Sequence, residues 1–455
     1  MPTPVIAIFD IGKTNKKIIL FDEQYNLIDE QSKEFQEITD ENGDACEDID
    51  ALSLWVKDTL ATLLLREDLV IKAINVSAYG ASFVHLDEQF KIVTPLYNYL
   101  KPYPKQLEEK FYQTYGGMAK VTRETASPVL GSLNSGLQLY RIKHESPEVY
   151  SRIKYSLHLP QYISHLITGK VYSEITSIGC HTHLWDFEKR KYHAWVLNEG
   201  IENKFPPIMK SDQGLSIKFG SGGKKIIAGS GLHDSSAALI PYIDAFPKPF
   251  VLISTGTWCI TLNPFNTSPL TEAELDRDCL CYLSYHGKPV KASRIFAGND
   301  HEIQIKRMAT HFKKKKDYYK AISFNPALVT ALRSTHKVQH SFISASGFQA
   351  EAVNLSVFST YEEAYHKLIM DIVERQKIST ELVLKNSPAK KIFVDGGFSK
   401  NPLFMHLLAR AFPQCEVYGA TISQATALGA ALAIHGFWNK ATISKNLIGL
   451  KHYAQ

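Results

Sequence analysis

Cysteine is scarce in this chain, and its six cysteines are scattered along the sequence. Only Cys279 and Cys281 are close neighbours, and one Cys-x-Cys pair does not supply the four ligands of a structural zinc site. A disulfide-stapled scaffold and a zinc ribbon are therefore both excluded. We expect reduced and mostly buried thiols, which are typical of a cytoplasmic protein.

Long apolar runs are also missing. No stretch approaches about 20 apolar residues, so we expect no membrane-spanning helix. Residues 1–4 lead directly into a strand pattern, without a basic region and a long apolar segment, so we expect no signal peptide.

The chain has no large excess of charge of either sign, because its net charge is only +5 over 455 residues. The one dense basic run, residues 313–316, lacks the interleaved aromatic residues and glycines of a nucleic-acid surface. A solvated helix face is the favoured interpretation of this run. The sequence thus predicts no nucleic-acid partner.

Hydrophobic residues make up 44% of the chain and charged residues 21%, which is typical of a well-packed globular protein. A chain of 455 residues exceeds one ordinary core, so two domains are expected. We place them at residues 1–245 and 246–455. The sequence leaves the oligomeric state open, a homodimer included.

Two segments, residues 5–22 and 250–262, share one pattern: a buried strand, a tight turn rich in glycine and hydroxyl side chains, and a return strand. Two such hairpins that face each other across a cleft could hold a polyphosphate between them. The remaining pattern predicts an α/β fold. Strands are expected over 71–77, 225–228 and 391–395, helices over 50–65, 135–143, 159–166, 402–412 and 423–433, a surface helix over 185–195, and a proline-rich linker over 241–249.

The first hairpin turn carries groups suited to a phosphate. Gly12 allows backbone amides to approach an anion, and the neighbouring side chains add positive charge and hydrogen-bond donors. The strand ends at Asp10, whose carboxylate suits a hydrated magnesium ion, since Mg²⁺ prefers carboxylates and phosphates. The plain alternative is an ordinary charged hairpin. The predicted phosphate ligands of this turn are Gly12, Lys13, Thr14, Asn15 and Lys17.

The second hairpin turn, with Thr255, Gly256 and Thr257, is the predicted partner loop. A third turn follows the strand that ends at Asp395. Its glycines, Gly396 and Gly397, would leave a slot without side chains for a flat adenine, with Asn401 near the base. The alternative is a plain strand-to-helix turn in which Ser399 is the helix N-cap.

Asp234 lies just ahead of the second hairpin, in the string Gly-Leu-His-Asp-Ser-Ser-Ala-Ala. A lone carboxylate at this position is placed to accept a proton from a substrate hydroxyl, which is the task of a general base. An aspartate at a helix start also caps the helix in many proteins. The adjacent His233 is either a substrate ligand or a packed core residue. Together with the paired hairpins, Asp234 indicates phosphoryl transfer.

The ordered set of motifs resembles the FGGY carbohydrate kinases over nearly the whole chain. The resemblance implies two actin-like (ribonuclease H-like) domains of the hexokinase, actin and chaperone superfamily with an interdomain cleft, and ATP- and Mg²⁺-dependent phosphorylation of a sugar hydroxyl. It also implies that Asp234 is the base, that Asp10 supports magnesium, and that ATP lies along Thr14, Thr257, Gly396, Gly397 and Asn401. The motifs are the Asp10 hairpin, residues 159–162, 166–169 and 173–176, the Asp234 string, residues 255–258, 396–401 and 427–431.

Within the family, the His233-Asp234 pair and the Thr-Gly-Thr-Trp string look most similar to kinases of L-rhamnulose and L-fuculose, so a related pentulose or hexulose is the expected substrate. Gly80, Ala81 and Ser82 align with a substrate segment in which rhamnulose kinases carry an aspartate at the position of Ser82. Phe398 replaces a residue that is usually small beside the adenine.

Two other functions compete with a sugar kinase. A nucleotide-binding regulator or chaperone-type module could use the same fold without a sugar. The loop-rich stretch from Tyr79 to Tyr103 and the base Asp234 argue against it, because a regulator needs neither. The third hypothesis is a sugar-binding relative that has lost its kinase activity. It is suggested by Ser82, which stands where the rhamnulose kinases carry an aspartate.

Overall fold

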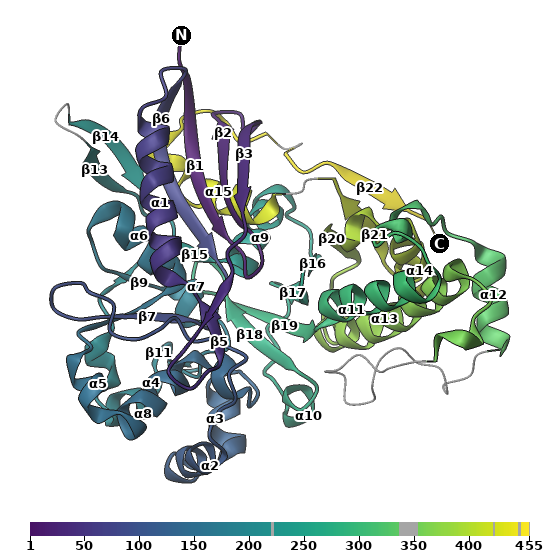
Figure 1. Ribbon diagram of the computed structural model, residues 1–455. Helices are drawn as coiled ribbons and strands as arrows, with labels where there is room; N and C mark the ends of the chain where they lie inside the picture. Colours follow the sequence, from purple (N-terminus) through teal and green to yellow (C-terminus); the bar gives the residue numbers. More distant parts are fainter. Residues whose placement is uncertain (220–222, 336–353, 422–423, 445–446, 455) are drawn as a thin grey trace.

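A computed structural model describes residues 1–455, apart from 220–222, 336–353, 422–423, 445–446 and 455. The chain forms two lobes, each built on a mixed β-sheet that carries helices (Figure 1). Among the described residues, no helix is long and apolar enough to cross a bilayer.

The first sheet is centred on β1, whose residues 5–9 are fully buried. A continuous apolar run is what a central strand covered on both faces requires. β1 pairs antiparallel with β2 and parallel with β6, so the hairpin predicted over residues 5–22 is confirmed. In order the strands are β13 (Leu215–Phe219), β14 (Lys224–Ala228), β6 (Leu69–Ala78), β1 (Thr3–Ile11), β2 (Lys16–Asp22) and β3 (Leu27–Lys33), with β15 (Leu232–His233) also on β6.

The second sheet repeats this plan. β16 pairs antiparallel with β17 and parallel with β20, just as β1 does with β2 and β6. The predicted second hairpin and the predicted repeat are therefore confirmed. In order the strands are β18 (Cys279–Leu283), β19 (Pro289–Ile295), β17 (Cys259–Asn263), β16 (Val251–Thr255), β20 (Lys391–Gly396), β21 (Glu416–Ala420) and β22 (Leu450–Tyr453).

Alternating side chains of β1 serve two cores, because successive residues of a strand point to opposite faces. Val5, Ala7 and Phe9 pack against α1 (Ile49–Leu64) and α6 (Leu159–Thr168). Ile6 and Ile8 pack against α9 (Asp234–Ala245) and α15 (Ala425–Ala433) on the other face. The second sheet is covered by α11 (Ala297–His311), α13 (Tyr361–Leu384) and α14 (Pro402–Ala411).

Helix α9 lies between the two sheets. Its Ala237 and Ile240 belong to the core of the first sheet, whereas Leu239 and Tyr242 belong to a core shared with β16 and β17. The first residue of this helix is Asp234, so the packing of α9 against both sheets fixes the position of that carboxylate.

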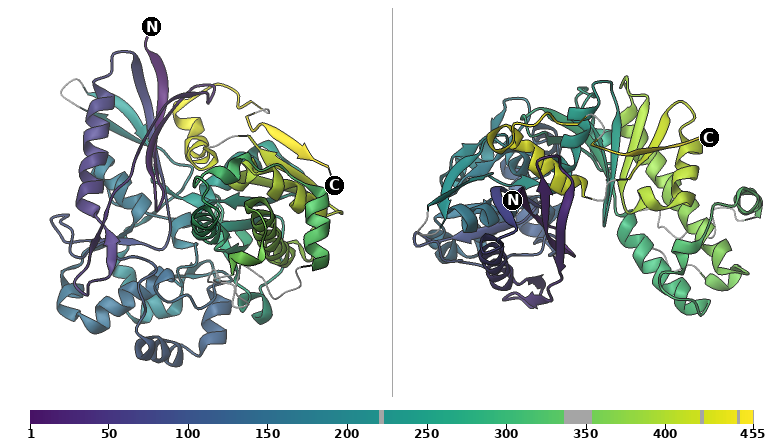
Figure 2. Two further views of the ribbon diagram at one scale, coloured as in Figure 1. Left: turned by 45° about the vertical axis from the view of Figure 1, so that its right-hand side comes forward. Right: turned by 90° about the horizontal axis from the view of Figure 1, so that it is seen from above.

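Helix α15 comes late in the sequence but packs beside α9 on the first sheet (Figure 2). A Cβ atom at Gly429 would lie 1.8 Å from the carbonyl oxygen of Ala237, so the small residues allow the close approach that the sequence predicted. The Asn75 side chain on β6 donates to the Ala430 carbonyl at 2.8 Å. The domain division at 245/246 stays a prediction, and the packing of α15 ties residues 425–434 to the N-terminal lobe.

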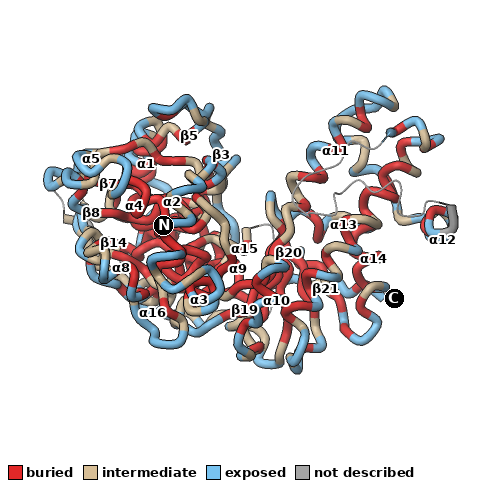
Figure 3. The backbone as a smooth tube through the Cα atoms, turned by 90° about the horizontal axis from the view of Figure 1, so that it is seen from below, coloured by how far each residue is buried: buried red, intermediate tan, exposed pale blue. Residues whose placement is uncertain are grey.

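The remaining elements are short, and most lie below the first sheet in Figure 1. Figure 3 shows buried residues running through both lobes and exposed residues gathered in the peripheral loops. These elements are β4 (Glu37–Thr39), β5 (Ala45–Glu47), β7 (Phe83–Leu86), α2 (Lys105–Thr114), α3 (Met118–Glu124), α4 (Ser135–Glu145), α5 (Pro147–Arg152), β8 (Tyr155–His158), β9 (Ser173–Glu174), α7 (Ile175–Ile178), β10 (Trp185–Asp186), β11 (Lys191–Tyr192), α8 (Ala194–Asn198), β12 (Ile208–Met209), α10 (Glu272–Leu275), α12 (Pro326–Thr335) and α16 (His435–Trp438), with 3-10 turns at 131–133, 201–204, 318–321, 355–357 and 398–400.

Three local predictions are wrong. Residues 185–195 form the hairpin β10–β11 and the start of α8, not one surface helix, and Trp195 is fully buried. Pro241 lies inside α9 and not in a linker. The lysines at 313–316 are exposed, as expected, but follow the end of α11 instead of forming a helix face.

Candidate active site

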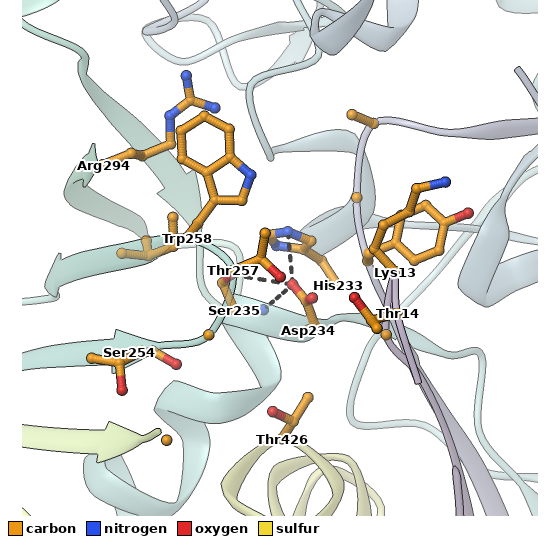
Figure 4. Close-up of a pocket in the computed structure, with 18 of the residues that line it drawn as sticks. Lys13, Thr14, His233, Asp234, Ser235, Ser254, Thr257, Trp258, Arg294 and Thr426 are labelled. Carbon is orange, nitrogen blue, oxygen red and sulfur yellow. Dashed lines mark hydrogen bonds and ion pairs between the residues drawn. The ribbon is translucent and has the colours of Figure 1, made fainter. Parts of the chain in front are cut away.

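A cavity of about 540 Å³ lies where the two hairpin turns meet the start of α9 (Figure 4). Side chains from both lobes form its wall. Twelve of the residues predicted from the sequence line it: Gly12, Lys13, Thr14, Asn15, Gly80, Ala81, His233, Asp234, Thr255, Gly256, Thr257 and Gly396.

The first turn is held by its own backbone. The amide of Gly12 donates to the Asn15 carbonyl at 2.9 Å. A Cβ at Gly12 would lie 3.0 Å from that same oxygen, so close approach, not an unusual dihedral angle, accounts for the glycine. The tip of the turn thereby presents Lys13 and Thr14 to the cavity.

The second turn rests on the N-terminus of α11. A Cβ at Gly298 would lie only 1.8 Å from the Gly256 carbonyl oxygen, and the Asn299 amide donates to the Thr257 carbonyl at 3.1 Å. On its outer side Gly256 is open, since the nearest atom to an added Cβ is the Trp258 carbonyl at 3.9 Å. A phosphate could therefore approach this backbone closely.

The glycine pair after β20 is locked to the second turn. Gly396 has φ +77°, and a Cβ there would lie 1.8 Å from the Thr255 carbonyl oxygen, so only glycine fits. The Gly397 amide donates to that same carbonyl at 3.0 Å. A Cβ at Gly397, in contrast, would meet nothing within 4 Å.

A second cavity, of about 920 Å³, adjoins the first and shares Gly256 and Glu302 with it. Gly397, Phe398 and Asn401 line this second cavity. Its position beyond the phosphate turns is where the adenine slot was predicted.

Asn401, not Ser399, caps α14, which corrects the cap expected from the sequence. The Oδ1 atom of Asn401 accepts from the Phe404 amide at 3.1 Å, and its Nδ2 donates to the Tyr365 hydroxyl at 2.8 Å. Ser399 instead donates to the Gly396 carbonyl at 2.9 Å. Asn401 thus shapes the edge of the second cavity, and its predicted contact with adenine stays a prediction.

Asp234 lies at the first position of α9 and is partly open to the cavity, with 35% of its side chain exposed. Its Oδ1 atom accepts from the Ser235 amide at 2.5 Å and the Ser235 hydroxyl at 3.1 Å. The Nε2 atom of His233 is 3.2 Å from this oxygen. These contacts orient the carboxylate at the start of the helix, where a negative charge is favoured.

Asp10 is next to this site at the end of β1. Burial, and to a smaller extent the negative charge of Asp234, raise the pKa of Asp10 to about 7, while the positive charge of Lys17 opposes this shift. A desolvated carboxylate near a second one suits a hard divalent cation, so Mg²⁺ fits these donors. Asp10 and Lys17 are not part of the cavity wall, and Lys17 pairs with Glu30 at 2.6 Å.

The predicted sugar segment, residues 80–82, lies only partly at the cavity. Gly80 and Ala81 line the cavity, and Ala81 has φ +61°, which is uncommon for a residue with a side chain. Ser82 is 1% exposed and does not line the cavity, and its hydroxyl is buried without a hydrogen-bond partner among the described residues. The structure therefore does not support Ser82 as a direct sugar ligand.

Several cavity residues were missed by the sequence analysis. Arg294 on β19 binds Asp278 through Nε and Nη2, at 2.7 Å for the shortest contact, and its guanidinium lies 4.9 Å from the Trp258 ring centre. No single-sequence pattern marks these residues, because they come from separate strands and loops. The missed residues include Leu133, His181, Tyr282, Arg294, Glu302 and Thr426.

Comparison with known proteins assigns the family. The N-terminal domain of the FGGY family of carbohydrate kinases matches residues 5–240, and the FGGY carbohydrate kinase C-terminal domain matches residues 247–442. The chain belongs to the FGGY family of carbohydrate kinases. The resemblance seen in the motifs is thereby confirmed for the family.

One curated relative is a rhamnulokinase of Halalkalibacterium halodurans, which is 27% identical over 265 residues. That alignment covers 55% of this chain and 52% of the relative, so the match spans about half the length of the rhamnulokinase.

Two solved structures share the fold. A carbohydrate kinase from Novosphingobium aromaticivorans has a TM-score of 0.77 at 22% identity and covers 100% of this chain and 95% of that one. A ligand-bound xylulose kinase from Lactobacillus acidophilus has a TM-score of 0.79 at 17% identity, with coverages of 99% and 94%. The predicted fold, two actin-like α/β lobes, is confirmed by these likenesses.

Proposed function

We propose that this FGGY family member phosphorylates a hydroxyl group of a ketose with ATP, and that Asp234 is the general base. The observation that carries the proposal is the position of Asp234, a partly exposed carboxylate in one cavity with both phosphate-type turns. A base must lie within hydrogen-bond reach of the proton that it removes. A sugar hydroxyl bound in this cavity would meet that condition.

In the proposed reaction Asp234 accepts the proton of the sugar hydroxyl. The oxygen then forms a bond to the terminal phosphorus of ATP, the bond from that phosphorus to the bridging oxygen breaks, and ADP leaves. Catalysis of phosphoryl transfer rests mainly on positioning and on charge stabilisation. The amide and the hydroxyl of Ser235 both donate to Oδ1 of Asp234 and thereby orient the carboxylate.

The two turns supply the nucleotide contacts in this proposal. Lys13 and Thr14 face the cavity from one lobe, and Gly256 and Thr257 face it from the other. Asp10 would hold magnesium, which neutralises phosphate charge when it is bound. The adjoining 920 Å³ cavity, with Gly397 at its open edge, would take the adenine.

The proposed substrate is L-rhamnulose, L-fuculose or a related pentulose or hexulose. Support comes from the rhamnulokinase relative and from the His233-Asp234 pair at the sugar end of the cavity. We propose a cytoplasmic location, since all six cysteines are free thiols and five of them are buried.

The deciding experiment measures ADP release from ATP and Mg²⁺ with a panel of ketoses: L-rhamnulose, L-fuculose, L-ribulose and D-xylulose. A kinase releases ADP only when an accepted sugar is present, and the Asp234→Asn variant should lose that release. Sugar-independent ATP hydrolysis, or nucleotide binding without turnover on any ketose, would instead support the regulator hypothesis.

A further inference from the structure

Three side chains that bind transition metals converge at the cavity wall: His181 and His233 line the cavity, and the fully buried Cys180 lies behind it. Each offers one ligand atom, the three atoms lie within 4.8 Å of one another, and all three residues are buried. The ligand atoms of a tetrahedral zinc ion lie about 3.5 Å apart, given bonds of about 2.0–2.3 Å. Small rotations of these side chains would therefore suffice to close on one ion.

The ring of His181 is oriented for such a role. Its Nδ1 is 2.9 Å from the Leu133 carbonyl oxygen, which accepts a hydrogen bond and cannot donate one. The proton of the neutral ring is therefore on Nδ1, and the lone pair is on Nε2. Metal-binding histidines commonly donate their second nitrogen to a backbone carbonyl in this way.

His233 has a comparable support behind its ring. Its Nδ1 is 3.4 Å from the Ser236 hydroxyl, and that hydroxyl donates to the Leu283 carbonyl at 3.1 Å. Ser236 is therefore left to accept from Nδ1, which would place the lone pair of His233 on Nε2. In the free protein Nε2 also lies 3.2 Å from the Asp234 carboxylate. The neutral ring carries only one proton, so it cannot donate to both the Ser236 hydroxyl and Asp234. A cation at Nε2 would remove this conflict and attract the carboxylate.

Gly80 leaves room where the ligand atoms meet. A Cβ atom at this position would lie 2.9 Å from the Cys180 sulfur and 3.0 Å from Nε2 of His233. Both atoms thus approach the same bare stretch of backbone. The rings of His181 and His233 are perpendicular, with centres 6.3 Å apart, so they approach the shared space from different directions.

We propose that Cys180, His181 and His233 form an inhibitory site for Zn²⁺, with Asp234 able to complete the set of four ligands. Zinc binds well to sulfur and imidazole nitrogen, whereas magnesium prefers oxygen ligands. Binding replaces the thiol proton of Cys180, which passes to solvent, by a sulfur–zinc bond. An ion here would lie at the wall of the cavity, beside His181 and His233, and would engage the proposed base. The inhibition rests on the proposed kinase activity, whereas the metal binding does not.

The binding is tested with Co²⁺ as a spectroscopic probe on the full chain after removal of metals. A thiolate ligand gives cobalt a near-ultraviolet charge-transfer band, so the wild type should show this band with one Co²⁺ per chain. Cys180→Ala should lose it, and the matched control Cys281→Ala should keep it. The band also separates this site from the other candidate group, Glu124, Asp186 and His193, which has no sulfur.

Two results would overturn the site: no thiolate band in the wild type, or a band that persists in Cys180→Ala. If Cys180→Ala fails to fold, His181→Gln provides the same comparison, with at least a tenfold loss of Co²⁺ affinity expected.

Inhibition is tested separately, at saturating Mg²⁺ and ATP. Zn²⁺ should block sugar-dependent ADP release, a zinc-selective chelator should restore it, and excess ketose should weaken the block. Cys180→Ala should need at least tenfold more Zn²⁺ than Cys281→Ala. Cobalt binding without this difference would remove the inhibitory role and keep the site, whereas the absence of ADP release in any condition would count against the proposed function alone.

Discussion

Lys16 and Glu47 form a buried ion pair behind the first hairpin turn, and their side chains are 3% and 5% exposed. Lys16 also donates to the Lys13 carbonyl at 3.0 Å, inside the turn. On its other side Glu47 accepts from the Tyr79 hydroxyl, next to the sugar segment. One buried pair therefore connects the turn that would hold phosphate to the strand end that would hold sugar.

Replacement of Glu47 by Gln should destabilise the protein strongly, because it leaves the charge of Lys16 buried without its partner. Loss of one member of a buried pair costs about 3–5 kcal/mol. Urea unfolding measures this difference. Glu37→Gln is the matched control, since Glu37 pairs with Lys13 at the surface, where an ion pair is worth about 0–1 kcal/mol. Equal losses in the two variants would contradict the importance of the buried pair.

The sequence predicted those parts of the fold that depend on local pattern. The apolar runs at 5–9 and 71–77 are central strands, and the helix expected at 50–65 is α1. The segment at 185–195 was misjudged, since its aromatic residues suggested a surface helix. In the structure Trp195 fills a buried cluster and donates to the His183 carbonyl at 2.7 Å. Tertiary packing decided that segment, and a local pattern does not record it.

The candidate site likewise contains residues that a local sequence pattern predicts and residues that only the tertiary fold brings together. Its turns were predicted because glycine and hydroxyl residues are adjacent in sequence, and Asp234 because a lone carboxylate stands just ahead of the second hairpin. The cluster of Cys180, His181 and His233 was missed, since its last two members are 52 positions apart in the sequence. His233 is placed by the pairing of β15 with β6, which no local pattern records. Arg294 was missed for the same reason.

Asp234→Asn should lower kcat with the accepted ketose by about 10²- to 10⁴-fold, the usual contribution of a general base. The affinity for ATP should change little, because the amide keeps the size of the side chain. Steady-state kinetics and calorimetry measure the two effects. Asp244→Asn, at the far end of the same helix, is the control and should retain turnover. Near-normal turnover in Asp234→Asn would show that another group accepts the proton.

The two open glycines should tolerate a larger residue in the free protein but not with ATP bound. A Cβ at Gly256 has its nearest neighbour at 3.9 Å, and a Cβ at Gly397 has none within 4 Å. Valine at either position should leave Tm nearly unchanged and weaken ATP binding, with sugar binding kept. Gly396→Val is the contrast, since it must distort the fold. Calorimetry with unchanged ATP affinity in a folded Gly256→Val variant would rule out the second phosphate turn.

Sugar specificity should depend on His181 more than on Ser82. His181 lines the cavity with a nitrogen lone pair that a sugar hydroxyl could reach, whereas Ser82 is buried outside the cavity wall. His181→Phe should change the ratio of kcat/KM for two ketoses, and Ser82→Ala should leave this ratio unchanged. The ratio reports differential binding of the transition state. A shift in Ser82→Ala would restore the sequence-based assignment of Ser82 as a sugar ligand.

Stability should fall in acid partly because of His85. Burial lowers the pKa of His85 to about 3, against an ordinary value of 6.5. Between pH 6.5 and 3 the unfolded chain therefore binds a proton at this residue that the folded chain does not, so the contribution to stability is present above pH 6.5 and declines as the pH falls. The slope for one such group is about 1.4 kcal/mol per pH unit.

A single variant is needed to see this slope, because other groups titrate in the same range. His158 and His183 also have pKa values lowered to about 3 by burial and add to the loss. Burial raises the pKa of Asp395 to about 7, so that carboxyl group acts in the opposite direction as the pH falls. His85→Asn removes one titrating group and leaves the others. Relative to wild type, the free energy of unfolding of this variant should rise by about 1.4 kcal/mol for each pH unit below 6.5. Urea titrations at pH 7.5, 6.5 and 5.5 that show a constant difference between the two proteins would mean that His85 titrates alike in the folded and unfolded chains.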